Sequence, residues 1–139
     1  MRFAPDKDFG SYSVRSYQAG QITITLPIST DEESPLAVNE LILTRSFIIA
    51  PRQLRENWPP QNVGELMAEH LQVVIDLEPE LVILGTGRVL EFPPPSLTES
   101  LYTKGIGVEI MDTAAACRTY NVLMHEGREV VAALIVDEI

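Results

Sequence analysis

The sequence predicts a single α/β domain across residues 1–139, in which helices flank a sheet and a β-rich part comes first. One observation is the run Leu81–Leu84, which is apolar at every position and therefore fits an interior strand covered on both faces. A second is that segments with helical spacing alternate with short apolar segments along the rest of the chain. We expect helices over 63–77, 96–104 and 113–125, and strands over 81–85, 107–111 and 129–136. If 81–85 and 107–111 share the sheet, a right-handed crossover makes them parallel neighbours.

The first third of the chain has the patterning of strands. Residues 21–28 alternate apolar with polar side chains, which predicts a half-buried strand, and Pro27 favours an edge position or a bulge. Further strands are expected over 13–17, 36–38 and 41–50. Residues 1–12 are expected to form a loose arm.

Capping signals mark where the helices are expected to begin. Asn62 with Glu65 makes a capping-box pattern before the first helix, and Ser96 with Glu99 makes another before the second. His70 lies within the apolar stripe of the first helix. No second metal ligand is spaced to share that face, so we predict a structural histidine rather than a ligand or a base.

The charge balance excludes some classes of partner. The chain has 20 acidic and 10 basic residues and a net charge of −10, which disfavours nucleic acid binding and a polybasic membrane anchor. The single cysteine, Cys117, excludes an intrachain disulfide and fits a reducing compartment. Neither a signal peptide nor a membrane-spanning apolar stretch is indicated. We therefore expect a cytoplasmic protein.

The turn after the apolar strand is the first candidate site. Gly85, Thr86 and Gly87 follow the carboxyl end of that strand, where ligands tend to bind in open α/β sheets. The turn lacks the third glycine of a dinucleotide fingerprint and the ending of a phosphate-binding P-loop. A plain tight turn and a ligand-binding notch therefore both remain open, and the residues alone favour the plain turn.

Arg118 is the second candidate. It shares a helical face with the small residues Ala114 and Ala115, which would let its long side chain lie against the sheet. A guanidinium group binds backbone carbonyls, a carboxylate or a phosphate. Alternatively, the side chain extends to solvent or serves only as scaffold. We expect its head to reach Gly85–Gly87, with one edge open to a pocket.

Support for covalent catalysis is weak. Cys117 lies inside an alanine-rich helix, where a small core residue is expected. His70 and His125 are far apart in sequence, and no nucleophile elbow accompanies them. We assign no catalytic residue, no cofactor and no metal, and leave enzymatic activity open while favouring its absence.

Three segments carry a resemblance to a known family, and it extends roughly from Ile22 to the end of the chain. They are Leu81-Val-Ile-Leu-Gly-Thr-Gly87, Gly105-Ile-Gly-Val-Glu-Ile-Met-Asp-Thr113 and Ala114-Ala-Ala-Cys-Arg-Thr-Tyr-Asn-Val-Leu123. The chain resembles the Mth-domain family of small proteins, which includes a mitochondrial respiratory complex I assembly factor and an adipogenesis-associated protein. The resemblance implies a three-layer fold around a mixed sheet, with no established enzymatic activity. It places the family's signature at Gly85, Thr86, Gly87, Met111, Asp112, Thr113, Arg118, Thr119 and Asn121.

Two functions are compatible with these observations. The first is a non-enzymatic interaction or assembly factor with a protein partner, which the resemblance to the complex I factor implies. The second is a protein or enzyme that binds a small, possibly anionic molecule in a notch between Gly85–Gly87 and Arg118. A helix N-terminus at Asp112 or Thr113 would add only about 0.3–1 kcal/mol for an anion. The candidate ligand or partner site comprises Gly85, Thr86, Gly87, Asp112, Thr113, Arg118, Thr119 and Asn121.

Overall fold

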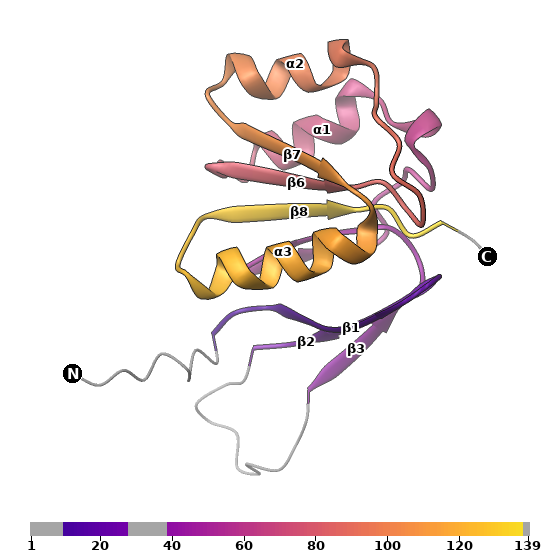
Figure 1. Ribbon diagram of the computed structural model, residues 1–139. Coiled ribbons are helices and arrows are strands. Elements are labelled where there is room, and N and C mark those ends of the chain that lie inside the picture. The colour runs from indigo at the N-terminus through magenta and orange to yellow at the C-terminus, as the bar shows by residue number, and fades with distance from the viewer. Residues whose placement is uncertain (1–9, 28–38, 138–139) are drawn as a thin grey trace.

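The computed structural model describes residues 10–27 and 39–137, and Figure 1 shows their arrangement. The strands are β1 (Ser13–Gln18), β2 (Gln21–Thr25), β3 (Glu40–Leu43), β4 (Phe47–Ala50), β5 (Gln53–Arg55), β6 (Leu81–Gly85), β7 (Gly107–Met111) and β8 (Val130–Leu134). The helices are the 3₁₀ turn η2 (Val63–Glu65), α1 (Ala68–Ile75), α2 (Pro95–Thr103) and α3 (Thr113–His125).

The strands form two sheets. A five-stranded mixed sheet has the order β5-β4-β8-β6-β7, and β1, β2 and β3 form a separate antiparallel sheet. Strand β6 runs parallel to both neighbours, with Leu81 opposite Gly107 of β7 and Val130 of β8. The predicted parallel pair and the interior position of 81–85 are therefore confirmed. The last strand, β8, lies at the centre of the sheet.

Alternation along β8 explains why its sequence is continuously apolar. Val130, Ala132 and Leu134 join a core cluster with α3 and the three-stranded sheet. Val131 and Ala133 join a second cluster with α1 and α2. Successive side chains of a strand point to opposite faces, so both faces of the central strand are covered. Figure 1 shows the resulting three layers: α1 and α2, the five-stranded sheet, and α3 with the three-stranded sheet.

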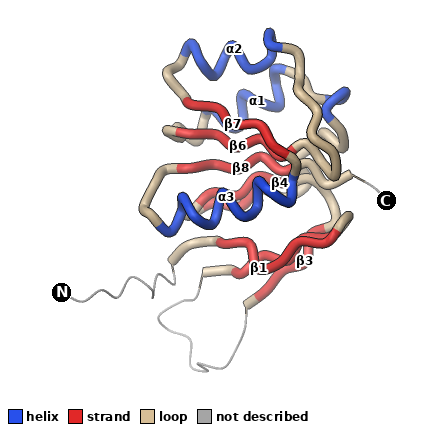
Figure 2. The backbone as a smooth tube through the Cα atoms, viewed as in Figure 1, coloured by secondary structure: helices blue, strands red, loops and turns tan. Residues whose placement is uncertain are grey.

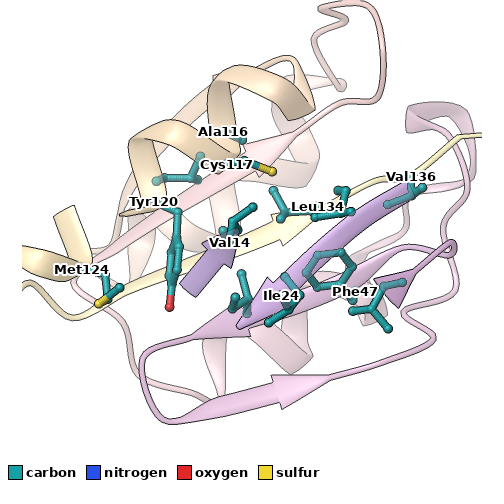
Figure 3. Close-up of a cluster of buried hydrophobic side chains, with 14 of the residues drawn as sticks. Val14, Ile24, Phe47, Ala116, Cys117, Tyr120, Met124, Leu134 and Val136 are labelled. Carbon is teal, nitrogen blue, oxygen red and sulfur yellow. The ribbon is translucent and has the colours of Figure 1, made fainter. Parts of the chain in front are cut away.

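The three-stranded sheet shares its core with α3. Val14 of β1 and Ile24 of β2 lie in one cluster with Phe47 of β4 and with Tyr120 and Met124 of α3. Figure 3 shows these side chains converging between the helix and the strands. The three-stranded sheet and the five-stranded sheet therefore share one hydrophobic cluster with α3.

The predicted helix 63–77 is wrong as a continuous helix. Asn62 caps the turn η2 by accepting a hydrogen bond from Glu65 N at 3.1 Å, and the chain then becomes extended at Leu66. Leu66 is buried in this conformation. Helix α1 begins anew after Met67, whose backbone N–H donates to His70 Nδ1 at 2.9 Å. His70 therefore has a structural role, as predicted, but it is a capping role that the sequence did not indicate.

The predicted strand 41–50 is two strands that belong to different sheets. Between β3 and β4, the Ser46 hydroxyl accepts a hydrogen bond from Val136 N at 2.9 Å. The other departures are local. Neither the edge position nor the bulge expected from Pro27 is found: β2 ends at Thr25 and lies between β1 and β3, and the bulge lies in β1, near Val14. Helix α2 begins after Pro94 without a side-chain cap, so the predicted Ser96–Glu99 capping box is not formed.

Part of the expected arm is ordered by contacts with the rest of the fold. Tyr12 N donates to Pro51 O at 2.9 Å, and Tyr12 O accepts from the Tyr120 hydroxyl at 2.8 Å. The rest of the arm, over 1–9, and the expected strand over 36–38 lie outside the described residues. Within the described ranges, none of the helices has the length and apolar character that a membrane crossing requires.

We expect Leu84→Ala to destabilise the protein by about 2–5 kcal/mol, the usual cost of truncating a buried leucine. Leu84 is fully covered in the interior strand β6, and truncation leaves a cavity there. Chemical denaturation should measure the loss, with Val122→Ala on the exposed face of α3 as the control. A loss below about 1 kcal/mol for Leu84→Ala would contradict full packing of β6.

Candidate functional site

The carboxyl ends of the parallel strands meet at the N-terminus of α3. Gly85, the last residue of β6, accepts a hydrogen bond from Ile135 N at 2.9 Å. On the other side, Thr86 N donates to Met111 O at 2.9 Å. A Cβ at Gly85 would lie 2.9 Å from Thr113 Oγ1 and 3.1 Å from Ala116 Cβ. Glycine is therefore required here so that α3 can approach the strand.

Thr113 connects three elements at this point. Its backbone N–H donates to Gly87 O at 2.9 Å, and its hydroxyl accepts from Gly87 N at 2.8 Å. The same hydroxyl donates to Ile135 O at 2.8 Å. Thr113 is 1% exposed, so these bonds are shielded from water. One side chain thus fixes the turn after β6, the start of α3 and the chain after β8.

Gly87 lies next to Asp137, the last residue that the structure describes. Its φ is +104°, and a Cβ there would lie 2.6 Å from Asp137 Oδ2. The positive φ makes any side chain at this position strained, and a Cβ would also require the Asp137 carboxylate to move. Arg88 N donates to the same oxygen at 3.2 Å, and Arg88 Nε lies 3.7 Å from Asp137 Oδ1.

The middle residue of the turn holds the loop that follows. The Thr86 hydroxyl donates to Val89 O at 2.8 Å and accepts from Glu91 N at 3.2 Å. Thr86 itself is buried. Among the described residues, no buried side-chain nitrogen or oxygen lacks a hydrogen-bond partner. The Thr86 hydroxyl is therefore engaged with the protein's own backbone.

Asp112 occupies the N-terminus of α3. Its Oδ1 accepts a hydrogen bond from Ala115 N at 2.8 Å, so Asp112 is the capping residue of this helix. A carboxylate at this position also complements the positive end of the helix dipole. The protein's own side chain therefore fills the place that an anion would take.

Arg118 does not make the predicted contact with Gly85–Gly87. Ala116, which approaches Gly85, is two positions earlier on α3, so the two side chains point about 160° apart around the helix axis. Arg118 is exposed, and the structure gives it no hydrogen bond to the turn. It lines instead a hollow of about 290 Å³ between β1 and α3, together with Tyr17 and Asn121.

Asn121 attaches the edge of β1 to α3. Its Oδ1 accepts from Val14 N at 2.9 Å, and its Nδ2 donates to Val14 O at 2.7 Å. The amide thus pairs with a strand residue as a neighbouring strand would. Thr119, the remaining predicted site residue, is half-buried on the same helix. The predicted site therefore divides into the junction at Thr113 and the β1–α3 contact.

Two residues near the junction were missed by the sequence analysis. Burial raises the pKa of Tyr17, and the nearby carboxylates of Asp137 and Asp112 raise it further, as does Cys117. Asp137 could have been anticipated, because it follows the last strand at the edge where the other parallel strands end. No pattern in the sequence around Tyr17 indicates that it lies near these carboxylates. Among the described residues, no group of three or more His, Cys, Asp or Glu side chains could hold a metal ion.

We expect Thr113→Val to destabilise the fold by about 2–6 kcal/mol. The substitution keeps the shape but leaves Gly87 N and Ile135 O buried without partners, at about 1–3 kcal/mol each. Urea denaturation of both this variant and Arg118→Ala is the measurement. The exposed Arg118 should change stability by less than about 0.5 kcal/mol. Equal losses for the two variants would contradict the role of Thr113.

We expect the Cys117 thiol to resist modification until the protein unfolds. Burial raises its pKa to about 12, so roughly one thiol in ten thousand is ionised at pH 8. Reaction with Ellman's reagent should be slow in buffer and fast in denaturant. Since the unfolded thiol has the lower pKa, this group's contribution to stability is complete below pH 9.0 and declines as pH rises toward about 12. Rapid native labelling would show that the thiol is accessible.

The chain is similar to curated and solved proteins. The mouse and bovine proteins named NADH dehydrogenase [ubiquinone] 1 alpha subcomplex assembly factor 3 are 42% and 35% identical over 79 and 116 residues. These matches cover 53% and 74% of this chain, but only 43% and 63% of those relatives. The solution structure of a Bordetella pertussis protein, described as an Mth938-like domain, is 29% identical with a TM-score of 0.72. That match covers 99% of this chain and 92% of the other.

A family model also matches most of the chain, over residues 28–135. Its description is "Protein of unknown function (DUF498/DUF598)". The matched range includes the Gly-Thr-Gly turn, Thr113 and all of α3. The Mth938-like neighbour agrees with the resemblance seen in the sequence. The chain therefore belongs to the DUF498/DUF598 family, whose relatives include complex I assembly factors and whose solved structures include an Mth938-like domain.

Proposed function

We propose that this protein is a non-enzymatic interaction protein that assists the assembly of a multi-subunit protein complex. The observation that carries the proposal is the similarity to the assembly factors, which for the bovine protein extends over 74% of this chain. The similarity covers less than two thirds of that relative. The proposal therefore concerns the shared domain and names no particular complex as the client.

The junction supports this proposal. The hydroxyls of Thr86 and Thr113 are bonded to backbone groups, and Asp112 caps α3. Residues that the resemblance places in the family's signature therefore have structural partners. Since their polar atoms are engaged, we assign recognition of the client to the surface that this junction supports.

A second function is favoured by one specific observation. The hollow between β1 and α3 presents the exposed Arg118 beside Tyr17 and Asn121. A guanidinium beside a phenol could bind a small carboxylate or phosphate. Asp112 and Asp137 influence Tyr17 electrostatically and would oppose an anion close to its hydroxyl. We therefore place small-molecule binding second.

Deletion of the gene in the native host should distinguish the two functions. If the protein is an assembly factor, native gel separation followed by mass spectrometry should show one complex stalled as a smaller subassembly. Complementation with the wild type or with Arg118→Ala should restore it, because Arg118 belongs to the hollow of the second function. Unchanged complexes, together with a small molecule that co-purifies with wild type but not with Arg118→Ala, would favour small-molecule binding instead.

A further inference from the structure

We propose that residues 89–92, here called the apolar loop, bind a protein partner that offers an apolar pocket with a basic rim. The inference rests on the proposed assembly function and identifies the surface that would perform it. The loop connects the Gly-Thr-Gly turn to α2. Figure 2 shows this connection as a long tan segment between β6 and α2.

The loop concentrates exposed apolar side chains. Val89 is 73% exposed, Leu90 47% and Phe92 68%. The other large apolar side chains that are exposed in the described ranges are dispersed over separate elements: Ile42, Met67, Tyr102 and Val122. Single exposed apolar residues are ordinary, whereas a contiguous group indicates a binding surface.

The backbone of the loop is held in place before any partner binds. Thr86 bonds to both Val89 O and Glu91 N, so one buried side chain closes the first half of the loop. Arg88, at its start, is bonded to Asp137. The loop leads into the prolines that precede α2, the first of which, Pro93, is buried. A fixed backbone loses little conformational entropy on binding, which favours affinity.

The negative charge of the chain favours a partner with basic residues around the binding pocket. The chain carries a net charge of −10, and Glu91 lies exposed among the apolar side chains. A second copy of this chain would bring another −10, and an anionic lipid surface would repel the protein as well. A basic rim would instead draw the partner toward the loop. Phe92 is the expected anchor, since aromatic residues dominate binding energy at interfaces.

The test uses a photo-cross-linking residue, p-benzoylphenylalanine, placed in the full-length protein in its native host. It replaces Phe92 in one variant and Tyr102, an equally aromatic residue that is 57% exposed near the far end of α2, in the control. We expect a discrete product with one other protein from position 92 and none from position 102. Mass spectrometry should place the cross-link in a segment with basic residues.

The identified protein is then purified and its affinity measured. Val89→Ser should weaken binding by about tenfold or more, whereas Val122→Ser, an equivalent change on α3, should leave it unchanged. Raising the salt concentration should slow association, because it screens the charge attraction. Both side chains are exposed, so thermal melting should confirm that the variants remain folded.

Each other result overturns the inference. A product of twice the chain mass would show self-association. Flotation of the wild type with phosphatidylcholine–phosphatidylglycerol vesicles, lost in Val89→Ser, would show a lipid-binding loop. A partner that binds Val89→Ser as well as wild type would refute this surface while leaving the assembly function intact. The assembly function itself fails separately, if deletion of the gene stalls no complex.

Discussion

The hydroxyl of Thr113 is the interaction on which the rest of the structure depends. It accepts a hydrogen bond from the turn after β6 and donates one to the chain after β8, while its own residue begins α3. This convergence leaves no room for a side chain at Gly85, and the positive φ of Gly87 disfavours one there. The Gly-Thr-Gly and Asp-Thr motifs, distant in sequence, are therefore two halves of one junction.

The junction leads outward to the surface. With Gly85 and Gly87 fixed, Thr86 is buried between them and holds the next residues through its hydroxyl. Turns of this kind in α/β folds often bind a ligand at the carboxyl ends of the strands. In this protein the same geometry orders a loop with three exposed apolar side chains. The Gly-Thr-Gly turn and Thr113 thus support a recognition surface in our account, and do not themselves form it.

The parts of the fold that could be predicted depend on local patterns. Local spacing indicated most of the strands and helices, and the helix-containing crossover between 81–85 and 107–111 indicated their parallel pairing. The incorrect predictions concern contacts between residues far apart in sequence. The segment 41–50 looks like one strand in the sequence, but the structure interrupts it near Ser46, whose hydroxyl accepts a hydrogen bond from Val136 N. Arg118 was misplaced because small residues beside it do not determine which side of α3 meets the sheet.

The most direct test of the central claim is hydrogen exchange at the amides of Gly87 and Glu91, measured by NMR in the wild-type protein. The first donates to Thr113 Oγ1 and the second to Thr86 Oγ1. If the junction is a rigid support for the apolar loop, both amides should exchange far more slowly than in an unstructured peptide, and Gly87 should approach the protection of the core strands. Exchange of both amides at unstructured rates would contradict the account.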